Sequence, residues 1–202
     1  MISHQLAKWY IENQVEAGCD EAGRGCLAGP VFAAAVILPK DFPFEFLDDS
    51  KKLSRKQREV ARKEIESKAI AWCVEQVEAD EIDEINILNA SILAMHKALT
   101  GLAIRPDFIL VDGNRFKIYH DIPHLCMIKG DGRFASIAAA SILAKTHRDD
   151  FMLRLSAEFP DYAWNKNKGY PTQEHIRAID KYGQTEWHRK TFVVKKQLSL
   201  DF

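Results

Sequence analysis

The sequence has no excess of either charge. Its 202 residues contain 28 Lys and Arg against 29 Asp and Glu, which gives a formal net charge of −1. A polyanion such as a nucleic acid must therefore be bound through a local basic patch. Long hydrophobic runs are also missing: the longest, residues 27–38, is too short to span a bilayer, and residues 1–10 lack the apolar core of a signal peptide. We expect a soluble cytoplasmic protein with no membrane partner.

Cysteine is scarce and scattered. The four cysteines, at positions 19, 26, 73 and 126, form no Cys-x-x-Cys pair. This pattern favours a reducing compartment and argues against a zinc site or a disulfide framework. Internal repeats and low-complexity tracts are absent as well. The length and the 47% hydrophobic content suit one domain, or one domain with a small appendage.

Apolar segments of strand length alternate with segments of helical periodicity, which predicts an α/β fold. The clearest helix pattern covers residues 80–99, where apolar residues recur every three or four positions. Ser54 followed by Gln57 is a capping-box pattern, so a helix should begin there. The predicted strands are residues 15–20, 30–38, 69–77, 107–112 and 125–128. Further helices should cover 136–145 and 172–182, with Thr172 as the N-cap of the latter.

Two adjacent acids, Asp20 and Glu21, end the first predicted strand and are followed at once by Gly23-Arg24-Gly25. Charged groups beside a buried strand cost free energy unless they are solvated, paired or bound to a metal. Adjacent strand residues point to opposite faces, so the backbone should turn or bulge at Glu21 if both carboxylates serve one site. Glycines permit such a turn and let the backbone approach a ligand closely. The alternative is an exposed acidic hairpin.

Acids also follow two other predicted strands. Asp112 ends a nearly continuous apolar run, and Asp131 lies between two glycines after residues 125–128. An acid at the carboxyl end of a buried strand is where α/β sheets place their sites. A turn-forming Asp-Gly pair is the alternative for Asp112. If the three strands are neighbours in the sheet, all four carboxylates can converge.

Carboxylates without a Cys or His cluster favour Mg²⁺ or Mn²⁺ over zinc. Two such ions roughly 3.5–4 Å apart can activate a water and stabilise a leaving oxygen in phosphodiester cleavage. In this hypothesis Asp20, Glu21 and Asp112 hold the first ion and Asp131 holds the second. Phosphates would be received by Lys51, by Lys145 and by the backbone of residues 23–25.

The region after Arg154 is locally basic and carries aromatic residues in two stretches, residues 164–172 and 187–190. Basic residues interleaved with Trp and Tyr suit a nucleic-acid surface. Solvated loops with anchoring aromatics are the alternative.

Six blocks together closely resemble the ribonuclease HII family and follow the order of its motifs between residues 15 and 192. The blocks are residues 20–25 (DEAGRG), 49–53 (DSKKL), 111–113 (VDG), 129–131 (KGD), 138–145 (AAASILAK) and 169–172 (GYPT). The resemblance implies an RNase H-like fold, with a five-stranded mixed sheet flanked by helices and a small helical C-terminal extension. It divides the chain into a catalytic domain (1–155), a helical and basic extension (156–196) and a tail (197–202).

The same resemblance implies endonucleolytic cleavage of the RNA strand of RNA/DNA hybrids and at ribonucleotides embedded in duplex DNA, leaving 3′-hydroxyl and 5′-phosphate ends. A monomer is the default state. The match assigns roles to eight residues: Asp20, Glu21, Asp112 and Asp131 correspond to the metal ligands, Gly23, Arg24 and Gly25 to the turn that recognises the ribose 2′-hydroxyl, and Tyr170 to the tyrosine that packs on the neighbouring deoxyribose.

Two features near the C-terminus stand apart. Lys190-Thr191 occupies a position where the family more often has Arg-Ser; both replacements are mild and still permit a phosphate contact there. The last six residues resemble the clamp-binding peptide Gln-x-x-Leu-x-Phe of bacterial replication and repair proteins, with a docked or frayed terminus as the alternative. The residues of this candidate partner site are Gln197, Leu198, Leu200 and Phe202.

Two rival functions differ in what they require. A resolvase or DNase of the same broad fold would need the carboxylates but neither Gly-Arg-Gly nor Tyr170. A non-catalytic hybrid-binding or clamp-adaptor module would need the basic patch and the tail but not four acids at strand ends. The presence of all these features favours the hybrid-specific endonuclease.

Overall fold

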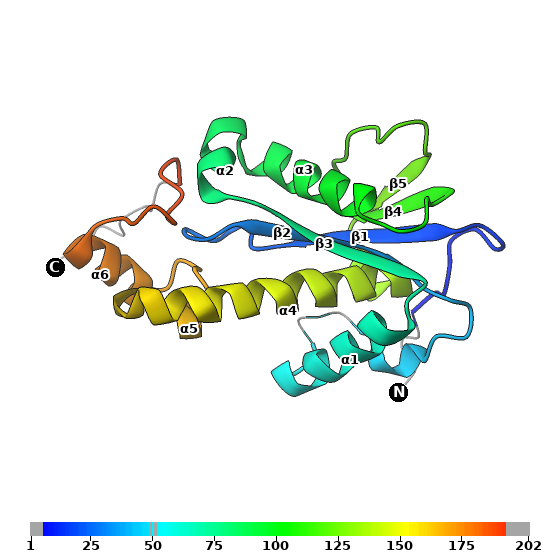
Figure 1. Cartoon of the computed structure of the whole chain (residues 1–202), viewed down its shortest axis with the longest axis horizontal. Coiled ribbons are helices and arrows are strands. Elements are labelled where there is room, and N and C mark those ends of the chain that lie inside the picture. The colour runs from blue at the N-terminus through cyan, green and yellow to red at the C-terminus, as the bar shows by residue number, and fades with distance from the viewer. Residues whose placement is uncertain (1–5, 49, 51, 193–202) are drawn as a thin grey trace, which may run out of the picture.

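A mixed five-stranded sheet forms the centre of the computed structural model, which describes residues 6–48, 50 and 52–192. The strands lie in the order β3-β2-β1-β4-β5. The strand β2 is antiparallel to both β1 and β3, whereas β4 is parallel to β1 and β5 is parallel to β4 (Figure 1). The bounds are β1 Glu16–Ala22, β2 Val31–Ile37, β3 Ala71–Val77, β4 Phe108–Asp112 and β5 His124–Met127. The predicted five-stranded mixed sheet is confirmed.

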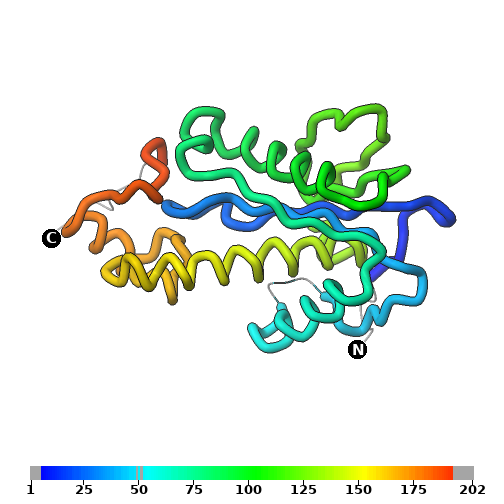
Figure 2. Tube along the Cα trace, in the orientation of Figure 1, coloured from blue at the N-terminus to red at the C-terminus, as the bar shows by residue number. Residues whose placement is uncertain are grey.

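Helices cover both faces of the sheet. One face carries α2 (Ala79–Ile85) and α3 (Ile87–Thr100), and the other carries the long helix α4 (Ala135–Glu158) with α1 (Arg55–Lys68) outside it (Figure 1). The helices α5 (Trp164–Asn167) and α6 (Gln173–Tyr182) form the helical C-terminal extension. Short 3₁₀ turns lie at Phe44–Phe46, Gly130–Gly132 and Pro160–Tyr162. In Figure 2 the C-terminal segment returns to the turn that joins β1 to β2.

The strand β2 shows why this sheet needs two helical layers. Its sequence, Val-Phe-Ala-Ala-Ala-Val-Ile, has no polar residue, and every position is buried. Such continuous apolar runs are typical of strands covered on both faces. On the α4 side the approach is very close: a Cβ at Gly18 of β1 would lie 2.2 Å from the carbonyl carbon of Ser136. The small residues of α4 and Gly18 together set the depth at which α4 packs on β1.

Two predicted element boundaries were wrong. The helix predicted over 80–99 is two helices, because Asn86 adopts a left-handed φ of 66° and breaks the chain direction. Its side-chain oxygen then accepts hydrogen bonds from the N–H groups of Leu88 and Asn89, both at 3.1 Å, and caps α3. The first strand does not end at Asp20 but continues to Ala22, so the backbone neither turns nor bulges at Glu21.

Other expectations at helix ends are confirmed. The Ser54 capping box at the start of α1 is present, and the Thr172 side chain caps α6 by accepting from the N–H of His175. The helix predicted over 136–145 is longer than its small-residue core and continues to Glu158, across the predicted boundary at 155. The division of the chain into domains stays a prediction.

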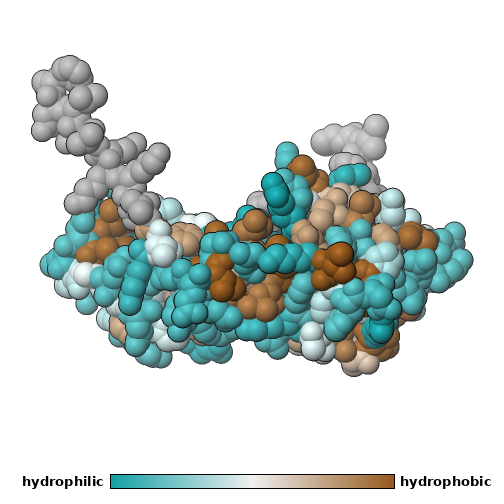
Figure 3. All heavy atoms as spheres, turned by 90° about the horizontal axis from the view of Figure 1, so that it is seen from above, coloured by the Kyte–Doolittle hydropathy of each residue, from teal (hydrophilic) through white to brown (hydrophobic). Residues whose placement is uncertain are grey.

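The surface mixes polar and apolar residues. Seen from the α2–α3 side, hydrophobic residues are interspersed with hydrophilic ones over the face that is visible (Figure 3). No helix among the described residues is both long and apolar enough to cross a bilayer.

Candidate active site

Asp20 and Asp112 lie next to each other on neighbouring parallel strands. The β1–β4 register pairs Cys19 with Val111, so the two acids occupy the following position on each strand. The Asp20 side chain is buried, and its Oδ1 accepts a hydrogen bond from the N–H of Glu21 at 2.7 Å. Burial raises the pKa of Asp20 well above its ordinary value, and the charges of Glu21 and Asp112 raise it further. Two of the three strand ends that carry the predicted acids therefore lie side by side.

Glu21 belongs to the same electrostatic group although it points to the other side of the strand. Burial raises its pKa, Arg24 opposes that shift, and the charge of Asp112 adds to it. The Arg24 guanidinium donates from Nη1 to Glu21 Oε1 at 3.1 Å, in an ion pair whose arginine is half exposed. Arg24 thus partly neutralises the acidic group from the solvent side.

Asp131 reaches this region from the segment that follows β5. It lies in the 3₁₀ turn Gly130–Gly132, is only 4% exposed, and accepts a hydrogen bond at Oδ1 from the N–H of Gly132 at 3.0 Å. The N–H of the preceding Gly130 donates to Asp112 Oδ1 at 2.7 Å. This bond ties the turn that carries Asp131 to the end of β4, so the carboxyl ends of β1, β4 and β5 meet at one edge of the sheet.

The donor chemistry of this edge suits a hard divalent cation. All four side chains offer carboxylate oxygens, and the nearby cysteines Cys19 and Cys26 are buried thiols whose pKa values are raised by burial. Within the described residues no three Asp, Glu, His or Cys side chains already stand in a metal-coordinating arrangement. The carboxylates of Asp20, Asp112 and Asp131 accept backbone N–H groups instead. A bound cation would relieve the repulsion that Asp20 experiences from Glu21 and Asp112.

The turn after β1 uses its two glycines for different reasons. Gly23 has a φ of +94°, and a Cβ there would lie 2.0 Å from Arg148 Nε, so the fold itself requires glycine. Gly25 is exposed, has no left-handed φ, and a Cβ there would meet nothing within 4 Å. Packing within the described residues gives no reason for a glycine at position 25.

Tyr170 lies on the loop between α5 and α6, and this loop is tied to the same turn. Its ring is 39% exposed. Its carbonyl oxygen accepts from Thr172 N–H at 2.8 Å and lies 3.0 Å from His175 Nδ1. The N–H of Leu27 donates to the carbonyl of Gly169 at 2.8 Å. An exposed tyrosine therefore stands on a fixed backbone beside the Gly23–Gly25 turn.

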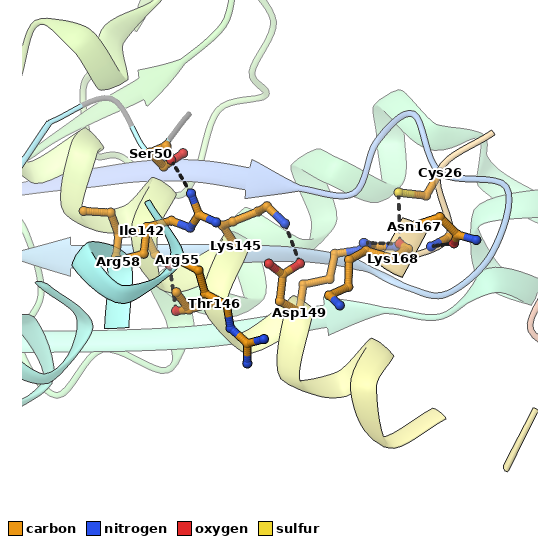
Figure 4. Close-up of polar contacts among 12 residues, drawn as sticks. Cys26, Ser50, Arg55, Arg58, Ile142, Lys145, Thr146, Asp149, Asn167 and Lys168 are labelled. Atoms are coloured by element: carbon orange, nitrogen blue, oxygen red, sulfur yellow. Dashed lines mark hydrogen bonds and ion pairs between the residues drawn. The ribbon is translucent and has the colours of Figure 1, made fainter. Parts of the chain in front are cut away.

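The structure describes some of the predicted phosphate-binding and partner-binding residues and not others. Lys145 projects from α4 and forms an ion pair with Asp149 one turn further on (Figure 4). Lys51 and the candidate partner residues Gln197, Leu198, Leu200 and Phe202 lie outside the described residues. Lys190 and Thr191 donate their backbone N–H groups to the carboxylate of Asp83, and the Thr191 hydroxyl donates to it as well.

The prediction of a nucleic-acid surface in the basic C-terminal region was partly wrong. Arg189, His188 and Trp164 are 0%, 1% and 0% exposed, so they cannot form part of a nucleic-acid surface. Arg189 donates to the carbonyl of Gly29 and, at 3.0 Å, to the carbonyl of Arg24. Arg189 therefore holds the turn between β1 and β2 from inside. Sequence alone gives no signal for this, because a buried arginine and an exposed one look alike in a basic stretch.

The sequence matches the family model described as Ribonuclease HII over residues 17–197. The chain is 62% identical over 199 residues to Ribonuclease HII of Bacteroides thetaiotaomicron, which covers 98% of this chain and 100% of that protein.

Solved structures agree with the sequence match. The structure of the PCNA:RNase HII complex from Archaeoglobus fulgidus superimposes with a TM-score of 0.74 at 25% identity, covering 93% of this chain and 100% of that one. Bst-RNase HIII in complex with Mn²⁺ has a TM-score of 0.66 at 18% identity, covering 94% of this chain and 69% of that one, which is a likeness of fold.

Proposed function

The chain belongs to the ribonuclease HII family and is a ribonuclease H, and from this premise we propose that it cleaves at ribonucleotides embedded in duplex DNA as well as the RNA strand of hybrids. The products would carry 3′-hydroxyl and 5′-phosphate ends. The observation that carries the proposal is the meeting of Asp20, Glu21, Asp112 and the Asp131 turn at one edge of the sheet, beside Gly25 and Tyr170.

The four acids are the proposed ligands of two divalent ions, Mg²⁺ or Mn²⁺. The related fold of Bst-RNase HIII, whose structure contains Mn²⁺, supports this choice. Bound ions would supply an activated water and stabilise the departing 3′ oxygen. Asp20, Glu21 and Asp112 would hold the first ion, and Asp131 would hold the second. The backbone N–H groups of Glu21, Gly130 and Gly132 orient three of the carboxylates.

Selectivity for ribose follows from the turn. A 2′-hydroxyl can donate and accept a hydrogen bond, and it is the group that separates RNA from DNA. A close backbone can bind it without reading the base. The open space at the Gly25 Cα supports this role, because a glycine that packing does not require there is explained by a substrate backbone that comes close.

Tyr170 would select the sugar that neighbours the ribonucleotide at the RNA–DNA junction. Its partly exposed ring offers a flat apolar surface to a deoxyribose, and a ribose there would press its 2′-hydroxyl against the ring. The turn and Tyr170 would therefore recognise an RNA-to-DNA junction together, the turn binding the ribose and the tyrosine binding the deoxyribose. Lys145 and Lys51 are proposed to contact the phosphates on either side. A monomer is the proposed state.

The experiment is digestion of a duplex that contains one ribonucleotide, compared with the same duplex made entirely of DNA. We expect cutting beside the ribonucleotide only, dependent on a divalent ion, with a 3′-hydroxyl end. Equal cutting of the all-DNA duplex would favour a resolvase or DNase of the same fold. Binding without cutting would favour an adaptor module. A 2′,3′-cyclic phosphate product would contradict the proposal, because it would show that the 2′-hydroxyl attacks instead of water.

A second role concerns the tail. We propose that residues 197–202 tether the enzyme to the DNA sliding clamp, because they match the pattern Gln-x-x-Leu-x-Phe and an apolar partner groove would bury Leu198 and Phe202. The Archaeoglobus relative is described in complex with PCNA, which supports a clamp as partner. A double alanine variant at positions 198 and 202 should lose clamp binding and keep cleavage of short duplexes. Unchanged clamp binding would refute the tether.

A further inference from the structure

Three segments that are far apart in the sequence are joined around the β1–β2 turn. Backbone bonds of 2.8 Å run from Leu27 N–H to the carbonyl of Gly169, from Arg189 N–H to that of Leu27, and from Gly29 N–H to that of Trp187. The turn, the loop that carries Tyr170 and residues 187–189 thus form one unit. We define this unit as the junction frame: residues 23–30, 168–170 and 187–189.

Arg148 of α4 lies inside the junction frame, with only 1% of its surface exposed. Its guanidinium donates from Nε to the carbonyl of Pro30 at 3.0 Å, from Nη2 to that of Ala28 at 3.1 Å, and from Nη1 to that of Lys168 at 2.8 Å. In the described part of the chain no carboxylate forms an ion pair with it. The charge is instead stabilised by hydrogen bonds to three main-chain carbonyls. Those of Ala28 and Pro30 belong to the β1–β2 turn, and that of Lys168 belongs to the Tyr170 loop.

The contacts of Arg148 fix the distance between the β1–β2 turn and the loop that carries Tyr170. A guanidinium is planar and its donors are rigidly spaced, so the carbonyls that it binds are held at set positions relative to one another. It also fills the space beside Gly23, where a Cβ would lie 2.0 Å from its Nε. A lysine ammonium is a compact group on a flexible stem and cannot reproduce three donors in one plane.

We propose that Arg148 is a positioning residue that sets the distance between the Gly23–Gly25 turn and Tyr170, and that it thereby sets the preference for an RNA-to-DNA junction over a uniform hybrid. The inference rests on the proposed function of these two elements. Arg148 does not touch the substrate; it acts by holding both reading elements on one frame.

The two substrate classes would contact different parts of the junction frame. A single ribonucleotide followed by deoxyribose engages the turn and the tyrosine together. A uniform RNA/DNA hybrid has a ribose at the tyrosine, so it engages the turn alone. If the distance between the Gly23–Gly25 turn and Tyr170 is no longer fixed, recognition of the junction substrate should therefore weaken much more than recognition of the hybrid.

The test is Arg148→Lys, which keeps the charge and removes the fork, with Arg154→Lys as the matched control. Arg154 lies on the same helix and is exposed. We expect Arg148→Lys to lower the ratio of kcat/KM for the junction duplex to kcat/KM for the hybrid by about tenfold, and Arg154→Lys to leave the ratio unchanged. An equal fall on both substrates would overturn the proposal, because it would show a general structural role.

A milder pair of variants decides the question if Arg148→Lys does not fold. The Cys26 thiol lies in the same frame, donates to the carbonyl of Lys168 at 3.6 Å (Figure 4) and also interacts with the Tyr170 side chain. Cys26→Ser keeps a donor at this place and Cys26→Ala removes it. The alanine variant should lower the junction-to-hybrid ratio about two- to threefold relative to the serine variant, and equal ratios would overturn the proposal. The parent enzyme separates this outcome from a failure of the proposed function, since absence of junction cleavage in the parent itself would refute the latter.

Discussion

Acidification should destabilise this protein through a buried histidine pair that supports the Tyr170 loop. The Trp164 indole N–H donates to His175 Nε2 at 2.9 Å, and His175 Nδ1 lies 3.0 Å from the carbonyl of Tyr170. His188 Nδ1 accepts from the N–H of Thr185 at 2.9 Å, and its Nε2 lies 3.2 Å from His175 Nε2. These bonds assign the proton to Nδ1 of His175 and to Nε2 of His188, and both rings are neutral.

A proton added to His175 Nε2 would face the N–H donors of Trp164 and His188, and one added to His188 Nδ1 would face the N–H of Thr185 and find only the Thr185 hydroxyl, at 3.0 Å, as an acceptor. Burial and the neighbouring His175 lower the pKa of His188 from 6.5 to about 4, and burial lowers the pKa of His175 as well. The unfolded chain binds the proton at ordinary pKa, so stability is complete above about pH 6.5 and is lost as the pH falls towards 4. Between pH 7.5 and 5.0 His188 alone should cost about 2 kcal/mol, or roughly 4–8 °C in Tm for a chain of this size.

The assay is urea unfolding at several pH values between 7.5 and 5.0, for the parent and for His188→Asn. Burial raises the pKa values of Asp20 and Glu21, which makes their contribution change with pH in the opposite direction, so the difference between parent and variant is the relevant quantity. The variant should be less stable at pH 7.5 and should lose about 2 kcal/mol of pH dependence. His120→Asn, at an exposed histidine, is the control. Parallel curves for the parent and His188→Asn would refute the reasoning.

Three further predictions concern the site and its support. Asp20→Asn should abolish cleavage and leave the fold intact or slightly more stable, because it removes a buried charge that Glu21 and Asp112 repel; activity and Tm measured on one preparation check this. Gly25→Ala should change the free energy of unfolding by less than about 0.5 kcal/mol and still weaken cleavage at a ribonucleotide, since its Cβ meets nothing in the fold. Gly18→Ala should cost about 3 kcal/mol in urea unfolding, because its Cβ would lie 2.2 Å from the backbone of α4.

Sequence patterns predicted those parts of the fold whose cause is local. The apolar run of β2, the capping box at Ser54 and the cap at Thr172 each depend on a few neighbouring residues, and each was found where predicted. The break at Asn86 was missed because the apolar stripe continues through it, and only the left-handed φ of that residue interrupts the helix.

The sequence likewise predicted only those parts of the candidate site that depend on local patterns. Acids after apolar runs predicted that the carboxyl ends of three strands would come together, and the order β1-β4-β5 places them side by side. The turn expected at Glu21 was wrong, since β1 runs on to Ala22 and pairs Glu21 with Ala33. The roles of Arg148 and Arg189 could not be predicted, because their partners are main-chain carbonyls from segments far apart in the sequence.

The most direct test of the account is the metal-dependent digestion of a duplex with one ribonucleotide by the parent and by Asp112→Asn, with the cut position mapped. If the four acids act at one point, the parent cuts beside the ribonucleotide when Mg²⁺ or Mn²⁺ is added, and the variant does not. Cutting by Asp112→Asn at the rate of the parent would contradict a shared site for these acids.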